Sequence, residues 1–365
     1  MKSLATQPVP LRLSAGRFAL YSIGLAAIGI LQIVHSHQFA FWDWPTFAGA
    51  AVRVGTPGLL DPKPLADAFT YLPGAAWLLA PLRGLSPAAG FATNAVAMLA
   101  AALAAAATAR RIYGFSLEFC AAAVLAWVPT TYAVVIGQNA PLGLLLVLLS
   151  LLGFTRGAPL LTALPLALLL YKPTYALPLL GLLALRGRRR ELGIVAVGAG
   201  VWYLVSVFAT GGDWGWPRAW LALERAFFAP DFAHNASKAI GLTTTLIRWH
   251  APGALVIALA LLVVAASLPS LRRAPAREAY AAACLLGLIV SPHAWSYDAV
   301  LMLPMLFVAV TELREPVRTP AVCAAYAVAP SVIVAHQIGF TPLALLVIGG
   351  YAWWLSARWK RAVAT

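Results

Sequence analysis

Residues 252–268 read PGALVIALALLVVAASL and contain no charged side chain. Apolar runs of roughly 15 to 22 residues are what crossing a ~30 Å hydrocarbon layer requires. In lipid the backbone must satisfy its own hydrogen bonds, and Leu- and Ala-rich segments do so as helices. This stretch therefore predicts a membrane-spanning helix.

Comparable apolar segments recur along the whole chain. Its 365 residues are 62% hydrophobic and only 10% charged, and the mean hydropathy is +0.83. That is more apolar sequence than one soluble core can bury. The segments lie at 18–34, 71–82, 87–109, 117–136, 139–154, 158–171, 173–185, 192–208, 252–268, 277–291, 297–311, 320–337 and 341–357. We predict an all-α, polytopic integral membrane protein of about 12–13 transmembrane or re-entrant helices, with residues 1–365 as a single domain.

One of these segments is expected not to cross the membrane. Both chain ends are basic, which favours the same, cytoplasmic side for both, whereas an odd number of crossings separates them. Segment 71–82 is the shortest and carries Pro73, Gly74 and Pro81. We expect 71–82, or part of 158–185, to be re-entrant or interfacial, as is allowed where protein buries the backbone.

The net charge of +14 comes from 26 basic and 12 acidic residues. The basic residues gather in short loops such as 186–190, as the positive-inside rule describes, so we expect no nucleic-acid partner. Lys2, Arg12 and Arg17 precede the span 18–34, and no small-x-small cleavage site follows it. We therefore expect a retained first helix rather than a removed signal peptide.

The sequence lacks the motifs that are typical of nucleotide binding, serine-hydrolase chemistry and metal binding. There is no nucleotide-binding glycine motif, Walker sequence or Gly-x-Ser-x-Gly elbow, and the three cysteines lack metal-ligand spacing. We expect no metal and no cofactor. Any energy-rich group donor then comes from elsewhere, and we favour lipid as its source.

Two polar stretches, 35–70 and 209–250, interrupt the apolar pattern. Trp and Tyr gather at their edges, as they do at membrane–water interfaces. Together the stretches hold half of the acidic residues, namely Asp43, Asp61, Asp67, Asp213, Glu224 and Asp231. We predict that both are loops on the non-cytoplasmic face.

Asp43 is the first candidate for chemistry, within FWDWPTF at residues 41–47. A carboxylate among aromatic side chains at the mouth of a membrane protein is placed to act as a general base. Alternatively, Asp43 is only the N-cap of a juxtamembrane helix, with Pro45 in its first turn.

Lys172 is the second candidate, because it follows the uncharged residues 158–170 and precedes Pro173. One reading is a cation that holds a lipid phosphate at the outer leaflet. The other is a lysine that snorkels to water from a helix end.

Three further motifs carry polar side chains. Gln138 and Asn139 break two apolar runs, either as a sugar-contacting turn or as an ordinary loop. The connection SPHAWSYD at 291–298 contains His293, which either contacts phosphate or sugar or is structural. Asn235 fits the glycosylation pattern Asn-x-Ser, or a polar turn that faces the substrate.

These motifs form an ordered series that resembles glycosyltransferase family 87, membrane mannosyltransferases of the GT-C type that use polyprenyl-phosphate mannose. The series is Asp43…Phe47, Tyr71-Leu72-Pro73, Gly137-Gln138-Asn139, Lys172-Pro173, Asn235-x-Ser237 with Gly241, and Ser291-Pro292-x-x-Trp295. The resemblance implies an all-α GT-C-like fold, an outward-facing active site and inversion at the anomeric carbon. It also implies that substrate binding involves Lys172, Gln138, Asn139, His293, Tyr71, Asn235 and Trp295.

The function that we predict is transfer of a hexose, mannose by the resemblance, from a polyprenyl-phosphate carrier to a hydroxyl of a lipid or glycan acceptor. Asp43 is the expected general base, and Lys172 with His293 neutralises the leaving phosphate. The partners are this donor, the acceptor and membrane lipids. We expect the protein in the bacterial inner membrane, serving the cell envelope, with its active site on the non-cytoplasmic face.

Two alternatives remain open. A transporter or flippase has ionisable residues along a path at mid-membrane depth, and a non-catalytic assembly subunit uses its loops only to bind partners. If the chain is an enzyme, Asp43, Gln138, Lys172 and His293 converge on one cavity. A scatter of more than ~15 Å favours the alternatives, because direct catalytic contacts do not reach that far.

Overall fold

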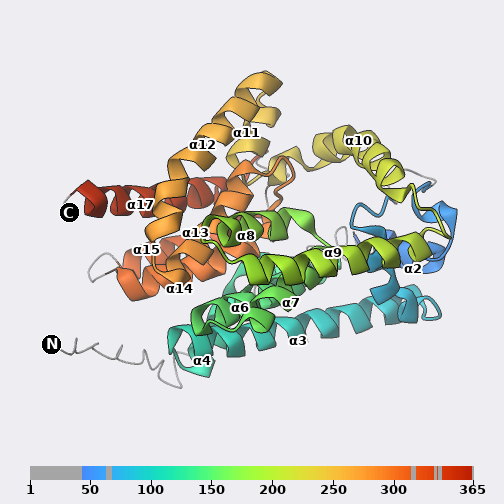
Figure 1. Cartoon of the computed structure of the whole chain (residues 1–365), viewed down its shortest axis with the longest axis horizontal. Coiled ribbons are helices and arrows are strands. Elements are labelled where there is room, and N and C mark those ends of the chain that lie inside the picture. Colours follow the sequence, from blue (N-terminus) through green and yellow to red (C-terminus); the bar gives the residue numbers. More distant parts are fainter. Residues whose placement is uncertain (1–42, 63–67, 314–317, 333–334, 336–338, 364–365) are drawn as a thin grey trace.

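Figure 1 shows the fold of the chain in a computed structural model. The structure describes residues 43–62, 68–313, 318–332, 335 and 339–363. Over this part of the chain the regular structure is helical and no strand forms, although an isolated antiparallel bridge joins Ala239 and Trp295. The predicted all-α membrane class is confirmed. The expected first span at 18–34 lies outside the described residues, as do Asp67 and the first residues of the polar stretch 35–70.

The helices follow one another with short connections. The α-helices are α2 (Trp44–Arg53), α3 (Pro87–Tyr113), α4 (Leu117–Ala126), α5 (Val128–Ile136), α6 (Ala140–Arg156), α7 (Pro159–Leu169), α8 (Pro173–Leu185), α9 (Arg189–Ala209), α10 (Trp216–Asn235), α11 (Leu242–Arg248), α12 (Gly253–Arg273), α13 (Ala276–Val290), α14 (Leu303–Glu312), α15 (Arg318–Val328) and α17 (Leu343–Val363). The 3-10 helices are η2 (Pro57–Leu59), η4 (Pro73–Leu78), η5 (Ala80–Leu82), η6 (Ala236–Lys238), η7 (Ser296–Met302) and η8 (Ala329–Val332).

Three helices of the described chain, α3, α9 and α12, are long and apolar enough to cross a membrane. The bent pair α4 and α5 makes a fourth if both helices belong to one span. Shorter apolar helices of 10–17 residues include α6, α7 and α8. The apolar segments expected from the sequence therefore form a few long helices and several short ones.

The predicted segment 117–136 is two helices, α4 and α5, which are bent by 60°. The break lies at Trp127, whose backbone is extended (φ −72°, ψ 102°). Pro129 in the first turn of α5 accounts for it, because a proline ring inside a continuous helix clashes with the carbonyl four residues earlier. At the break the Trp127 side chain is buried, and its Nε1–H donates to the Ala299 carbonyl at 2.9 Å.

Segment 71–82 is not a crossing helix, in agreement with its short length and its prolines. It forms η4, which begins at Pro73, and then η5, which contains Pro81. The segment packs against α9, where the Gly74 N–H donates to Ser206 Oγ at 2.9 Å. Irregular backbone is thus held against protein, as a lipid environment requires.

The two predicted polar loops contain helices, α2 in 35–70 and α10 in 209–250, and these two helices lie at the end of the molecule opposite the C-terminus (Figure 1). The α10 helix forms because apolar side chains such as Leu223 recur at helical spacing between the charged ones. Contacts join the two stretches. The Gly55 N–H donates to the Ala209 carbonyl at 2.7 Å, and Trp220 Nε1–H donates to the Thr70 carbonyl at 3.3 Å. Their location on the non-cytoplasmic face stays a prediction.

The core places two chain segments side by side at this end. The α13 helix is buried along most of its length, packs against α8, α12, α14 and α17, and ends directly before residues 291–298. The α6 and α8 helices approach closely at Gly143, where an added Cβ would lie 2.6 Å from Tyr175 Cε2. The start of α8 and the 291–298 connection are therefore held beside each other.

Candidate active site

A cavity of about 200 Å³ opens where α2, α8 and α10 meet the 291–298 connection. Its lining residues are Asp43, Thr46, Phe47, Ala68, Thr70, Tyr71, Ile136, Gln138, Tyr171, Lys172, Pro173, Thr174, Trp220, Glu224, Phe227, Asp231, Asn235, Lys238, His293 and Tyr297. Asp43, Gln138, Lys172 and His293 all belong to this set, as the enzyme hypothesis requires. So do Tyr71 and Asn235.

Asn139 and Trp295, which we expected to contact the substrate, are not among the residues that line this cavity. Asn139 is contacted by the Tyr171 hydroxyl, which lies 3.4 Å from both its backbone carbonyl and Oδ1. Trp295 is buried under the wall formed by His293. Both residues therefore support side chains that face the cavity.

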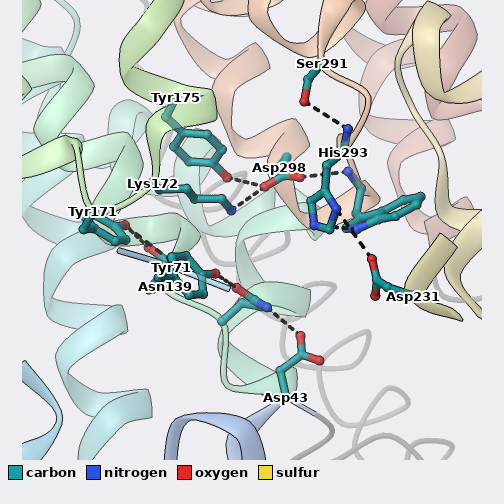
Figure 2. Close-up of polar contacts among 12 residues, drawn as sticks. Asp43, Tyr71, Asn139, Tyr171, Lys172, Tyr175, Asp231, Ser291, His293 and Asp298 are labelled. Carbon is teal, nitrogen blue, oxygen red and sulfur yellow. Dashed lines mark hydrogen bonds and ion pairs between the residues drawn. The ribbon is translucent and has the colours of Figure 1, made fainter. Parts of the chain in front are cut away.

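Asp43 lies at the N-cap position of α2, but its side chain makes no capping hydrogen bond. Its Oδ2 instead accepts from Gln138 Nε2 at 2.7 Å (Figure 2). Burial raises the pKa of Asp43, while the Gln138 hydrogen bond and the charge of Lys238 lower that pKa. Asp43 therefore occupies the N-cap position, but its carboxylate bonds to Gln138 and does not cap the helix.

Gln138 reaches Asp43 because the chain turns sharply at Gly137 after α5. Gly137 has a φ of +88°, and a Cβ there would lie 3.2 Å from Trp44 Cβ, so a side chain at this position is strained and crowded. The Tyr71 hydroxyl donates to Gln138 Oε1 at 2.7 Å. This bond fixes the amide so that its NH₂ group points at Asp43.

Lys172 is buried and does not snorkel to water, so that alternative is wrong. Its Nζ forms an ion pair with Asp298 Oδ1 at 2.6 Å, and Figure 2 shows both Lys172 and Tyr175 directed at this carboxylate. Aromatic rings surround the ammonium, whose Nζ lies 4.2 Å from the ring centroid of Tyr175, 5.0 Å from that of Tyr297 and 5.9 Å from that of Tyr71. The cation is held at the cavity wall by charge and by π-faces.

His293 is held between Trp295 and Asp231. Trp295 Nε1–H donates to His293 Nε2 at 2.9 Å, so this nitrogen is the unprotonated one of a neutral ring. The other nitrogen, Nδ1, faces Asp231 Oδ2 at 3.5 Å. Burial lowers the pKa of His293 despite the nearby carboxylates, so the imidazole is neutral near pH 7.

Asn235 is the last residue of α10 and is half-buried. Its Nδ2 donates to Asp231 Oδ1 at 2.8 Å, and its Oδ1 accepts from Lys238 Nζ at 2.9 Å. A glycosylation acceptor belongs in an exposed loop. The geometry therefore favours a residue that organises the α10 side of the cavity.

Sequence reasoning assigned no role to four charged residues that the structure brings to this site, Glu224, Asp231, Lys238 and Asp298. Burial raises the pKa of Glu224 to about 7, and burial lowers the pKa of Lys238 to about 8. Glu224 and Asp231 are seven residues apart, two turns of one helix, so an α-helix predicted over 216–235 would have placed them on one face. Asp298 is the last residue of SPHAWSYD, and no sequence pattern there indicates a contact with Lys172.

Within the described part of the chain, no group of three or more His, Cys, Asp or Glu side chains is arranged to hold a metal ion.

The chain matches a known protein family. The model described as Glycosyltransferase family 87 matches residues 69–292, more than half of the chain. The matched region contains Tyr71, Gln138, Lys172 and Asn235, whereas Asp43 lies before it. No curated protein and no solved structure matches the chain.

Proposed function

The chain belongs to glycosyltransferase family 87 and is a membrane glycosyltransferase, and from that premise we propose that it transfers mannose from a polyprenyl-phosphate carrier to a hydroxyl of a lipid or glycan acceptor. The reaction inverts the anomeric carbon and takes place on the non-cytoplasmic face of the bacterial inner membrane. The donor is a membrane lipid, which suits a chain with helices long and apolar enough to cross a membrane.

The observation that carries the proposal is the convergence of a half-buried carboxylate and a buried cation on one cavity. Asp43 and Lys172 both line it, although 129 positions separate them in the sequence. Phe47, Tyr71 and Trp220 add aromatic faces on which a sugar ring can pack. A transporter path would distribute ionisable residues along the molecule instead.

Asp43 is the general base in this proposal. As the acceptor oxygen attacks the anomeric carbon, its proton passes to the Asp43 carboxylate, and the bond between that carbon and the phosphate oxygen breaks. The electron pair of this bond stays on the leaving phosphate. A pKa raised by burial makes Asp43 a stronger proton acceptor than an exposed aspartate, and Gln138 orients it.

Lys172 stabilises the charge that develops on the leaving phosphate. The ammonium is fixed in place before the substrate arrives, which avoids reorganisation during the reaction. His293 is neutral, so we assign to it a hydrogen-bonding role in place of the expected charge neutralisation. Tyr71 acts through Gln138, and Asn235 through Asp231 and Lys238.

The direct test is transfer of labelled mannose from polyprenyl-phosphate mannose in membranes that carry the wild type or Asp43→Asn. We expect the substitution to reduce transfer by about 10²–10⁴-fold, the usual contribution of a general base. The matched control is Asp61→Asn, an exposed carboxylate that does not line the cavity and that we expect to leave transfer unchanged.

Equal transfer by wild type and Asp43→Asn at equal expression would remove Asp43 from the role of base. No transfer by the wild type with this donor, when a crude lipid extract serves as acceptor, would contradict the proposed mannose donor.

A further inference from the structure

Asp298 lies one layer behind the cavity wall and carries more polar contacts than its neighbours. It is 1% exposed and does not line the cavity. Its Oδ1 accepts from both Lys172 Nζ and the Tyr175 hydroxyl at 2.6 Å, and its Oδ2 accepts from the Trp295 N–H at 2.8 Å. One carboxylate thus connects the start of α8 with the 291–298 connection.

This arrangement fixes the direction of the Lys172 ammonium. A lysine has a flexible four-carbon stem, so a single well-placed acceptor decides where its charge points. The Trp295 N–H bond holds Asp298 at the start of η7, and the Tyr175 hydroxyl approaches the same oxygen as Lys172. Asp298 is therefore itself held rigidly.

The same carboxylate also balances the charge of Lys172. A phosphate bound beside the ammonium meets a negative charge immediately behind it, and two charges at such separations interact strongly in a protein interior. The donor in the proposed reaction is a phosphodiester with one negative charge. The lipid product is a phosphate monoester, which carries about 1.5 to 2 negative charges near pH 7. Repulsion by Asp298 is consequently larger for the product than for the donor.

We infer that Asp298 is a positioning residue that directs Lys172 at the phosphate and, through its own charge, promotes release of the polyprenyl-phosphate product. This inference rests on the role of Lys172 in the proposed function. It adds a residue that touches neither substrate but sets both the orientation and the net charge of the phosphate site.

The test measures binding separately from transfer, in the purified full-length protein. The probes are farnesyl phosphate, a prenyl monophosphate, and farnesol, which has the same chain without the charge. Asp298→Asn keeps the shape of the side chain and removes its charge. We expect farnesyl phosphate to bind about tenfold more tightly to this variant and farnesol to bind equally to both proteins. We also expect kcat for mannose transfer to fall several-fold, because product release slows and Lys172 is no longer directed.

Unchanged or weaker binding of farnesyl phosphate by folded Asp298→Asn would overturn the inference, because removing the charge of Asp298 would then relieve no repulsion of the bound phosphate. The binding assay contains no sugar donor. Failure of the wild type to transfer mannose would therefore count against the proposed function and leave the binding result to judge Asp298.

A second variant covers the case in which Asp298→Asn does not fold. Tyr175→Phe removes one hydrogen bond to Asp298 Oδ1 and leaves both charges in place. We expect kcat to fall about threefold to tenfold, while farnesyl phosphate affinity stays within about twofold of wild type. Unchanged kcat in this variant would show that the held geometry behind Lys172 does not matter, and would contradict the positioning role.

Discussion

The charged side chains on the two sides of the cavity differ in how completely they are paired. On the α8 side, Lys172 and Asp298 neutralise each other at 2.6 Å, with Tyr175 and the Trp295 backbone completing the set. On the α10 side, Glu224 Oε1 and Asp231 Oδ2 are buried, and neither has a hydrogen-bond partner in the described chain beyond the approach of His293 to Asp231 at 3.5 Å. The α8 side therefore contains an ion pair, whereas on the α10 side two carboxylate oxygens can still accept hydrogen bonds.

The difference indicates a division of labour in the proposed reaction. A paired charge keeps its ionisation state and its geometry, which suits stabilisation of a phosphate. A carboxylate whose pKa burial raises to about 7, as for Glu224, changes protonation near neutral pH, which suits proton transfer. Burial raises the pKa of Asp43 as well as that of Glu224, and both side chains line the cavity.

The largest effect should come from breaking the completed pair. Lys172→Met leaves the Asp298 carboxylate buried without its countercharge, and we expect a loss of about 3–5 kcal/mol in the free energy of unfolding. Adding Asp298→Asn to this variant should recover much of that loss, since no isolated charge then remains. Thermal unfolding of the detergent-purified variants measures both steps. A double variant no more stable than Lys172→Met would mean that the pair is not the unit that stabilises this side.

A smaller effect is expected where Gln138 connects Tyr71 to Asp43. Gln138→Leu removes the hydrogen bond that most lowers the pKa of Asp43, so burial raises this pKa further. A base acts only when ionised, so the acid limb of the kcat/KM profile should move to higher pH, and loss of the orienting hydrogen bond should lower kcat/KM at pH 7 about tenfold.

Gln138→Glu sharpens the same measurement, because a second carboxylate beside Asp43 should move the limb in the same direction by more. An acid limb that stays in place in both variants would show that Asp43 is not the group that titrates in catalysis.

The smallest effect belongs to Glu224 on the α10 side. Burial raises its pKa from 4.5 to about 7, so the folded protein keeps a proton that the unfolded chain has lost within this window. Stability contributed by this group therefore falls as pH rises from about 4.5 to about 7. Glu224→Gln should remove that loss and be more stable than wild type by about 1–2 kcal/mol above pH 7, a figure reduced for the partial exposure of the side chain.

Unfolding of wild type and Glu224→Gln at pH 5 and pH 8 checks this prediction. Glu118→Gln, at an exposed carboxylate at the start of α4, is the matched control and should show no comparable gain at pH 8. If the stability difference between wild type and Glu224→Gln does not grow with pH, Glu224 behaves like a paired charge, and the contrast between the two sides is weakened.

Much of the site could be predicted from single residues that are out of place in an apolar chain. Asp43, Gln138, Lys172 and His293 stand out because charged and amide groups are costly in lipid, and all four line the cavity. His293 was nevertheless predicted as a source of positive charge, and burial with the Trp295 bond makes it neutral. Glu224 was missed because residues 209–250 were predicted to form a polar loop, whereas residues 216–235 of this stretch form the helix α10.

The sequence by itself determined the membrane class, the helical structure and most of the residues that meet in the cavity, because hydropathy and misplaced polar groups are local properties of the chain. Only the tertiary structure decided which polar side chains contact one another. Asp298 contacts Lys172, which is 126 positions away in the sequence, and Gln138 contacts Asp43, which is 95 positions away. Such pairings depend on how α8, η7 and the turn at Gly137 pack, and the charge state of each group follows from the pairing and burial that this packing creates.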